Sequence, residues 1–152
     1  MRVAGPEAVR LSRYWLLATD PSVYHWDTLF VKGKELWSQV RSDAALRYLK
    51  QARRGDQALC YHGAPERSIY AHAAVASDPY PDPHARNKNH LVIDLKAVQR
   101  LPRPVTVKDL KADKILRKMK FLARPRLAVS PLSEQEFNEI LHLGGVSLGP
   151  FR

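Results

Sequence analysis

Short apolar runs separated by turn residues recur along the chain from residue 13 onwards. The first run, Tyr14–Leu17, precedes Asp20-Pro21, a pair typical of a turn. Runs of the same kind predict strands at 57–62, 69–76, 90–98 and 126–129. Gly55-Asp56 and Gly63-Ala64-Pro65 are the turn residues around the second run. The pattern therefore predicts about five strands.

Helix start and stop signals occur at three places. Ser133 and Glu136 have the spacing of a capping box, and Gly144 is placed to end that helix. Its expected buried residues are Phe137, Ile140 and Leu141. A second helix is expected to start at Ser42 or Asp43, to bury Leu46 and Leu49, and to stop at Gly55. A third, short helix is expected to start at Thr106 and run through Leu110.

Strands interrupted by short helices predict an α+β fold. The elements show no alternation of strand and helix and no internal repeat, which favours a small mixed barrel over a doubly wound sheet. A length of 152 residues fits one domain. We expect this domain to span residues 13–145, with tails at 1–12 and 146–152, because both ends lack a hydrophobic period.

The charge of the chain indicates an acidic partner. Lys and Arg number 25 against 15 Asp and Glu, which gives a net charge of +10 and a pI near 10.0. Nucleic acid is the first candidate. The sequence has no apolar stretch long enough to span a membrane, so we expect no membrane partner and a cytoplasmic location, or a nuclear one in a eukaryote. Cys60, the single cysteine, is interpreted as a buried small apolar residue rather than a nucleophile.

The best-defined enzyme signatures are missing from the sequence. It contains no Gly-rich phosphate loop and no HExxH, CxxC or GxSxG motif, so no catalytic residue and no cofactor are predicted. His84 and His90 lie near Asp78 and Asp82, but the prolines between these residues indicate an irregular loop. We interpret them as exposed loop histidines and predict no metal site.

Aromatic residues alternate with cations in the first half of the chain. Trp15, Trp26 and Trp37 with Arg41, and Tyr61 beside His62, could offer a planar surface and hydrogen-bond donors to a base. The alternative is that the tryptophans are core residues. Cations placed to contact phosphates, or else simply to face solvent, are Arg47, Lys50, Arg53, Arg54, Lys118 and Lys120, with further candidates at Lys111, Lys114, Arg117, Arg124 and Arg126.

Six segments together resemble the ordered motifs of EVE domains. They are Tyr14–Pro21, Trp37–Arg41, Tyr61-His62, Tyr80–Pro83, Arg103–Thr106 and Arg126–Pro131. The resemblance implies a PUA-like fold, a mixed β pseudo-barrel with short peripheral helices. It also implies a non-enzymatic nucleic-acid-binding domain that reads a modified base, such as 5-methyl- or 5-hydroxymethylcytosine, flipped into an aromatic pocket. Any effector that acts on the recognised nucleic acid would then be a separate protein.

The same resemblance implies roles for individual residues. Trp37 and Tyr61 are expected to stack on the base, while Arg41 and His62 donate to its edge or to a phosphate. The alternatives are an ion pair for Arg41 and a strand histidine bonded to the backbone for His62. The predicted pocket comprises Trp15 on a wall, Thr19 and Asp20 at the rim, Trp37, Arg41, Tyr61, His62 and Ser130, with Thr19 and Ser130 reading the base edge.

Two other functions stay open at this point. One is binding of structured RNA, in which the basic surface contributes most of the affinity. The other is a nuclease or base-modifying enzyme that uses His62 and a nearby carboxylate such as Asp20.

Overall fold

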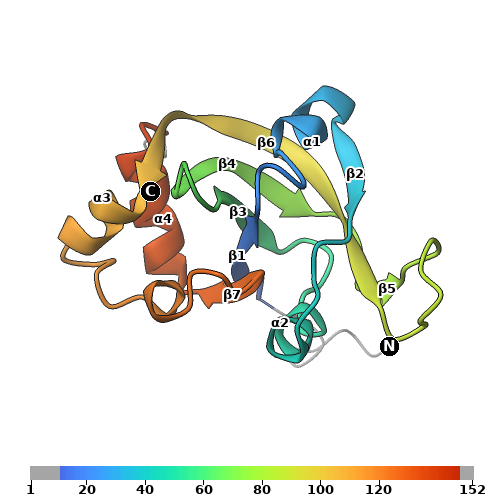
Figure 1. The fold of residues 1–152 in the computed structure, drawn as a ribbon. Coiled ribbons are helices and arrows are strands. Elements are labelled where there is room, and N and C mark those ends of the chain that lie inside the picture. The colour runs from blue at the N-terminus through green and yellow to red at the C-terminus, as the bar shows by residue number, and fades with distance from the viewer. Residues whose placement is uncertain (1–10, 148–152) are drawn as a thin grey trace, which may run out of the picture.

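One mixed sheet of seven strands forms the body of the protein in the computed structural model, which describes residues 11–147 (Figure 1). The sheet order is β2-β6-β4-β3-β1-β7, and β5 pairs with β6. The strands are β1 (Tyr14–Thr19), β2 (Lys34–Trp37), β3 (Gln57–His62), β4 (Ser68–Val75), β5 (Tyr80–Pro81), β6 (Leu91–Thr106) and β7 (Val129–Leu132). The helices are α1 (Asp27–Lys32), α2 (Asp43–Leu49), α3 (Val107–Ala112) and α4 (Glu134–Leu143), with a 3₁₀ turn η2 (Lys120–Ala123).

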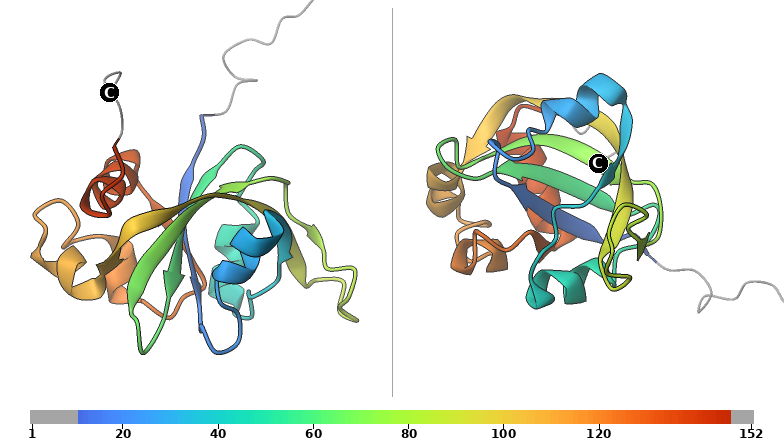
Figure 2. Two further views of the ribbon diagram at one scale, coloured as in Figure 1. Left: turned by 90° about the horizontal axis from the view of Figure 1, so that it is seen from above. Right: turned by 45° about the vertical axis from the view of Figure 1, so that its right-hand side comes forward.

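The pairing of β1 with β3 determines where the site forms. These two strands are parallel, with Tyr14 opposite Gln57 and Thr19 opposite His62, whereas β7 is antiparallel to β1. The carboxyl ends of β1 and β3 therefore lie side by side. Figure 2 shows the loop after β1 and the loop between β3 and β4 projecting from the same end of the sheet. A hydrogen bond of 2.8 Å from the Gly63 N–H to the Thr19 carbonyl joins these loops.

The sheet has more strands than the five expected from the sequence. The four-residue β2 and the two-residue β5 were not predicted, because runs so short carry no clear alternation. Strand β6 continues to Thr106 instead of ending at 98. Two prolines, Pro102 and Pro104, argue against a strand there, but they fall where the pairing of β6 with β4 shifts register. An irregular ladder tolerates their missing N–H groups.

The predicted helix caps are confirmed, and one helix is shorter than expected. Capping boxes are present at Thr106 with Asp109 and at Ser133 with Glu136. The second helix, α2, ends at Leu49 instead of reaching Gly55. It stops because Ala52 turns into the core and the Arg53 N–H donates to the Asp56 carboxylate at 2.9 Å. The predicted burial of Leu49 is confirmed, whereas Leu46 is only half-buried.

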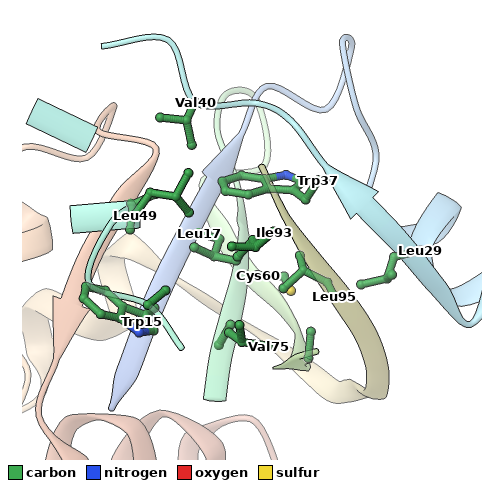
Figure 3. Close-up of a cluster of buried hydrophobic side chains, with 14 of the residues drawn as sticks. Trp15, Leu17, Leu29, Trp37, Val40, Leu49, Cys60, Val75, Ile93 and Leu95 are labelled. Carbon is green, nitrogen blue, oxygen red and sulfur yellow. The ribbon is translucent and has the colours of Figure 1, made fainter. Parts of the chain in front are cut away.

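Two apolar clusters pack on the sheet. One contains the three tryptophans and is shown in part in Figure 3, where Trp15 and Trp37 lie at opposite ends of a group around Leu17, Cys60 and Ile93. The other packs the sheet against α3 and α4 through Phe121, Phe137 and Ile140, among others. Cys60 is fully buried, which raises the pKa of its thiol, so the prediction of a buried small residue is confirmed.

Most of the tails expected at 1–12 and 146–152 lies outside the described residues. Across residues 11–147, no helix is both long and apolar enough to cross a membrane.

Candidate nucleic-acid interface

A cavity of about 660 Å³ opens at the end of the sheet where β1 and β3 finish. Its walls come from four segments that are distant in sequence: the end of β1, the end of β3 with its following loop, the loop between β2 and α2, and the loop before β7. The lining residues are Ala18, Thr19, Asp20, Val23, Gln39, Arg41, Ser42, Tyr61, Gly63, Ala64, Pro125, Arg126 and Ala128. Four of the eight predicted pocket residues are among them: Thr19, Asp20, Arg41 and Tyr61.

The turn after β1 forms one rim of the cavity and is closely hydrogen-bonded. One oxygen of the Asp20 carboxylate accepts the Ser22 N–H at 2.9 Å and the Ser22 hydroxyl at 2.7 Å. These bonds lower the pKa of Asp20, so the side chain is a carboxylate at neutral pH. The Thr19 hydroxyl donates to the Tyr24 carbonyl at 3.0 Å. Thr19 can therefore accept a hydrogen bond from a ligand, but its proton is already in use.

His62 belongs to the support of this rim and does not line the cavity. Its Nε2 atom accepts the Trp26 backbone N–H at 2.9 Å, and the Trp26 indole N–H donates to the Tyr61 carbonyl at 3.0 Å. Burial, together with the nearby His25, lowers the pKa of His62 to about 4. The prediction that His62 donates to a base is therefore wrong, because the side chain is 1% exposed and is not among the residues that line the cavity. The alternative of a strand histidine bonded to the backbone is confirmed.

Arg41 lies at the junction of two hollows. Its Nη1 group donates to the Ser38 carbonyl at 2.7 Å and contacts His90 Nε2 at 2.9 Å. Its partners among the described residues are thus carbonyls and an imidazole, not the carboxylate of an ion pair. Arg41 also lines a hollow of about 260 Å³ that contains Asn87, Asn89 and His90. These contacts fix the Nη1 group of the guanidinium, while the Arg41 side chain as a whole is exposed beside the cavity.

Two more arginines stand at the mouth of the cavity. Arg126 lines the cavity itself and, with Arg124, a further hollow of about 410 Å³. Both side chains are exposed, while Leu127 between them and β7 is buried and anchors the segment. The sequence placed these two arginines only among general phosphate candidates. Arg126 is also the first residue of Arg126–Pro131, one of the six motif segments, and its place in that motif could have identified it as a cavity residue.

Three predicted pocket residues lie in the core instead. Trp15 is 2% exposed and donates its indole N–H to Asp56 at 2.9 Å, and Trp37 is 1% exposed and stacks on Trp26 at 5.8 Å. The predictions of Trp15 as a pocket wall and of Trp37 as a stacking surface are therefore wrong. A face already covered by another ring cannot stack on a base. Ser130 is also buried, on β7 beside Leu16, and does not line the cavity.

Two of these core residues carry an unsatisfied polar group. The Trp37 indole N–H and the Ser130 hydroxyl have no hydrogen-bond partner within residues 11–147. Tyr61 retains contact with the cavity, but it is only 3% exposed and packs edge-on against Phe121 at 4.7 Å. The cavity therefore presents an edge of Tyr61 to a ligand, not an open aromatic face.

The predicted phosphate contacts are exposed but lie outside the three hollows. The first four lie on α2 or in the turn that follows it: Arg47, Lys50, Arg53 and Arg54. Lys118 lies just before η2, and Lys120 is the first residue of η2. The Arg53 guanidinium donates to the Lys50 and Ala52 carbonyls at 2.8 and 2.7 Å. Phosphate binding by these six residues stays a prediction. Within the described part of the chain, no group of three or more His, Cys, Asp or Glu is arranged to hold a metal.

Comparison with known proteins gives consistent matches over most of the chain. The family model described as "EVE domain" matches residues 13–143. Thymocyte nuclear protein 1 from rat is 26% identical, over 88% of this chain and 74% of the relative. A protein from Rhodopseudomonas palustris has a solved structure with a TM-score of 0.81 and 34% identity, covering 88% of this chain and 93% of that one. A structure of human THYN1 protein in complex with DNA containing 5-methylcytosine has a TM-score of 0.74 and 23% identity, covering 90% and 99%.

Proposed function

This chain belongs to the EVE domain family, and from that premise we propose that it binds DNA and reads a modified cytosine turned out of the base stack into the cavity. The seven-stranded mixed sheet with short peripheral helices is the expected PUA-like α+β pseudo-barrel. The human relative solved with 5-methylcytosine-containing DNA supports a modified-DNA ligand for this chain.

The cavity at the ends of β1 and β3 is the observation that carries the proposal. Its volume of about 660 Å³ falls in the usual range of small-ligand sites, and polar groups project from apolar walls. A cytosine offers an amino donor at N4, which carboxylates accept. Asp20 supplies such a carboxylate, and one of its oxygens remains free of the Ser22 bonds. Gln39 and Arg41 supply donors for the acceptor atoms of the base.

Planar guanidinium groups replace the tryptophans as the proposed stacking partners. Arg41 and Arg126 line the cavity and are exposed, and arginine planes stack on unpaired bases. Pro125 and the edge of Tyr61 add apolar contact. A flipped base would lie between these groups, and its stacking would offset part of the free energy lost on leaving the helix.

The charge around the mouth favours a phosphate backbone as the rest of the ligand. Arg41, Arg124 and Arg126 border three hollows whose linings all include Ser42, and the chain has a net charge of +10. Cations at the mouth would hold the phosphates that flank the flipped nucleotide, and binding would weaken with salt.

Reading a base in this way needs no covalent step, and we propose a binding domain rather than an enzyme. The alternative of a nuclease required His62 to act with a carboxylate such as Asp20. Asp20 lines the cavity, whereas His62 is buried outside the lining and has its acceptor nitrogen bonded to the Trp26 amide. The two side chains therefore do not form one acid and base pair facing a ligand.

A titration of fluorescent oligonucleotides tests the proposal. Duplexes carry cytosine, 5-methylcytosine or 5-hydroxymethylcytosine at one position, and a matched RNA hairpin is included, each at two salt concentrations. We expect one modified duplex to bind more tightly than the plain one at both salt concentrations. Equal affinity for every DNA probe, lost at high salt, together with tighter binding of the hairpin, would support the RNA alternative instead.

A further inference from the structure

An apolar side chain is exposed at the rim of the cavity. Val23 lines the cavity and is also 70% exposed. The other exposed large apolar residues of the described chain do not line it; they are Leu11, Val31, Val98 and Ile115. A single exposed valine is ordinary on a protein surface, so the distinguishing observation is its position at the mouth of the cavity, where a partner that fills the site would meet it.

The turn that carries Val23 is held in one conformation by its own hydrogen bonds. The Val23 and Tyr24 N–H groups both donate to the Asp20 carbonyl at 2.9 Å. The Ser22 N–H and hydroxyl donate to the Asp20 carboxylate, and the Thr19 hydroxyl donates to the Tyr24 carbonyl. Valine itself is stiff because it branches at Cβ. The exposed side chain is thus presented on a firm support.

The base of the turn is fixed to the sheet as well. The Trp26 backbone N–H is bonded to His62 and its indole N–H to the Tyr61 carbonyl, so both ends of the segment 20–26 are anchored. Figure 2 shows this loop projecting beyond the end of the sheet, next to the loop between β3 and β4. A projecting, well-supported apolar tip has the properties of a side chain that inserts between bases.

We propose that Val23 enters the base stack of duplex DNA at the step from which the modified cytosine leaves. This inference rests on the proposed function, because only a base taken out of a duplex leaves a space to fill. Unstacking costs a few kcal/mol, and apolar side chains wedged between bases are a known way to stabilise opened steps. Val23 on the rim would occupy that space while Asp20, three residues earlier, faces the base in the cavity.

The charge of the turn is compatible with this position. Asp20 is its acidic residue, and one oxygen of that carboxylate is turned back onto Ser22. The tip, Pro21-Ser22-Val23, carries no charged side chain. The tip itself therefore adds no charge that would repel the phosphates, and the one anion of the turn, Asp20, lines the cavity.

The test compares Val23→Ala with the matched control Val31→Ala on single-stranded and duplex DNA. Val31 is 82% exposed, lies on α1 and is not part of the cavity. The probes are one 5-methylcytosine oligonucleotide as a single strand and as a duplex, and the same two forms with plain cytosine. We expect Val23→Ala to bind the duplex about tenfold more weakly, because two methyl groups are removed from the contact in the base stack. Its loss of affinity for the single strand, which has no opened step to fill, should be much smaller. Val31→Ala should leave both affinities unchanged.

A further probe checks the cause of the loss. In a duplex with a mismatched base opposite the 5-methylcytosine, pairing is already weak, so the defect of Val23→Ala should become smaller. Equal losses on single strand and duplex would overturn the proposal, since Val23 would then contact the base inside the cavity. Unchanged affinity on both would overturn it as well. A parent protein that prefers 5-methylcytosine in neither form would instead contradict the proposed function.

Discussion

The Nε2 atom of His62 accepts the backbone N–H of Trp26 at 2.9 Å, and this bond joins the end of β3 to the loop that forms one rim of the cavity. To accept this hydrogen bond, the imidazole must be neutral and Nε2 must carry no proton. The carbonyl of the preceding residue, Tyr61, accepts the Trp26 indole N–H. A pair of residues 36 positions apart in sequence thereby holds the loop that carries Asp20 and Val23.

The stability of the fold should fall as the pH falls from about 6.5 to about 4. Burial lowers the pKa of both His62 and His72 to about 4, from an ordinary value of 6.5. In this window the unfolded chain binds more protons than the folded one, so acid favours unfolding. Each histidine could account for up to about 3 kcal/mol. Urea unfolding at several pH values measures the slope.

Histidine variants separate these two groups from the rest of the chain. His62→Gln and His72→Gln should each flatten the dependence of the unfolding free energy on pH in that window. The control is His84→Gln, which changes an exposed loop histidine and should leave the slope unchanged. A slope that stays the same in both buried variants would show that neither histidine is held neutral by the fold.

Trp37 should matter for stability and not for base recognition. Because its side chain is buried and stacked on Trp26, Trp37→Ala should destabilise the protein by about 3–5 kcal/mol. The milder Trp37→Phe should stay folded and keep its affinity for a modified duplex within about twofold. Chemical denaturation measures the loss of stability, and anisotropy titrations of the same preparations measure the affinity for the modified duplex. A folded Trp37→Phe that has lost base discrimination would return this residue to the binding site.

The salt dependence of binding should depend on the arginines at the mouth. If Arg126 contacts one phosphate, Arg126→Gln should reduce the slope of log K against log salt by about 0.9 on duplex DNA. Arg41→Gln should lower affinity and also weaken discrimination between bases, because Arg41 lines the cavity. Lys111→Gln is the control, since Lys111 is an exposed cation on α3 outside the three hollows. A drop of the same size in the control would show that general charge, not the mouth, sets the slope.

Asp20 should distinguish 5-methylcytosine from thymine. Both bases carry the same methyl group, but cytosine presents an amino donor where thymine presents a carbonyl acceptor. The parent protein should therefore prefer 5-methylcytosine in a single strand by about 10- to 100-fold, the range expected for a good edge contact. Asp20→Asn should lose most of this preference, because an amide can donate as well as accept. If Asp20→Asn kept the preference for 5-methylcytosine, a group other than Asp20 would have to accept the hydrogen bond from the cytosine amino group.

Local signals in the sequence predicted the three helices that have a side-chain cap and missed α1, whose N-cap residue Trp26 makes no side-chain cap bond. The spacing of Ser133 with Glu136 predicts a capping box because both partners lie within one helical turn, and the expected helix start at Thr106 has a capping box with Asp109 in the structure. Strand β2 depends on pairing with β6, more than fifty residues later in the chain, and no local pattern encodes that pairing. The extension of β6 past its prolines depends in the same way on the irregular register with β4.

The candidate site was predicted in part for a similar reason. Motif position located Thr19, Asp20 and Tyr61, which lie at or just after the ends of β1 and β3, and Arg41, which lies in the loop between β2 and α2. It could not tell which way a side chain points. Trp37 is on the core face of its strand, while Gln39, two positions later in the loop, lines the cavity. Val23 and Pro125 had no chemical signal in the sequence, and only the assembled rim shows them.

The most direct measurement of the central claim is a titration of ¹⁵N-labelled protein with a 5-methylcytosine oligonucleotide, followed by amide chemical shifts. If the base enters the cavity, the largest changes should occur at the amides that line it, including Asp20, Gly63, Ala64 and Ala128. The same oligonucleotide with plain cytosine should produce smaller changes there. Shifts confined to the basic residues of α2 and of 118–120, equal for both oligonucleotides, would contradict the account and leave only an electrostatic surface.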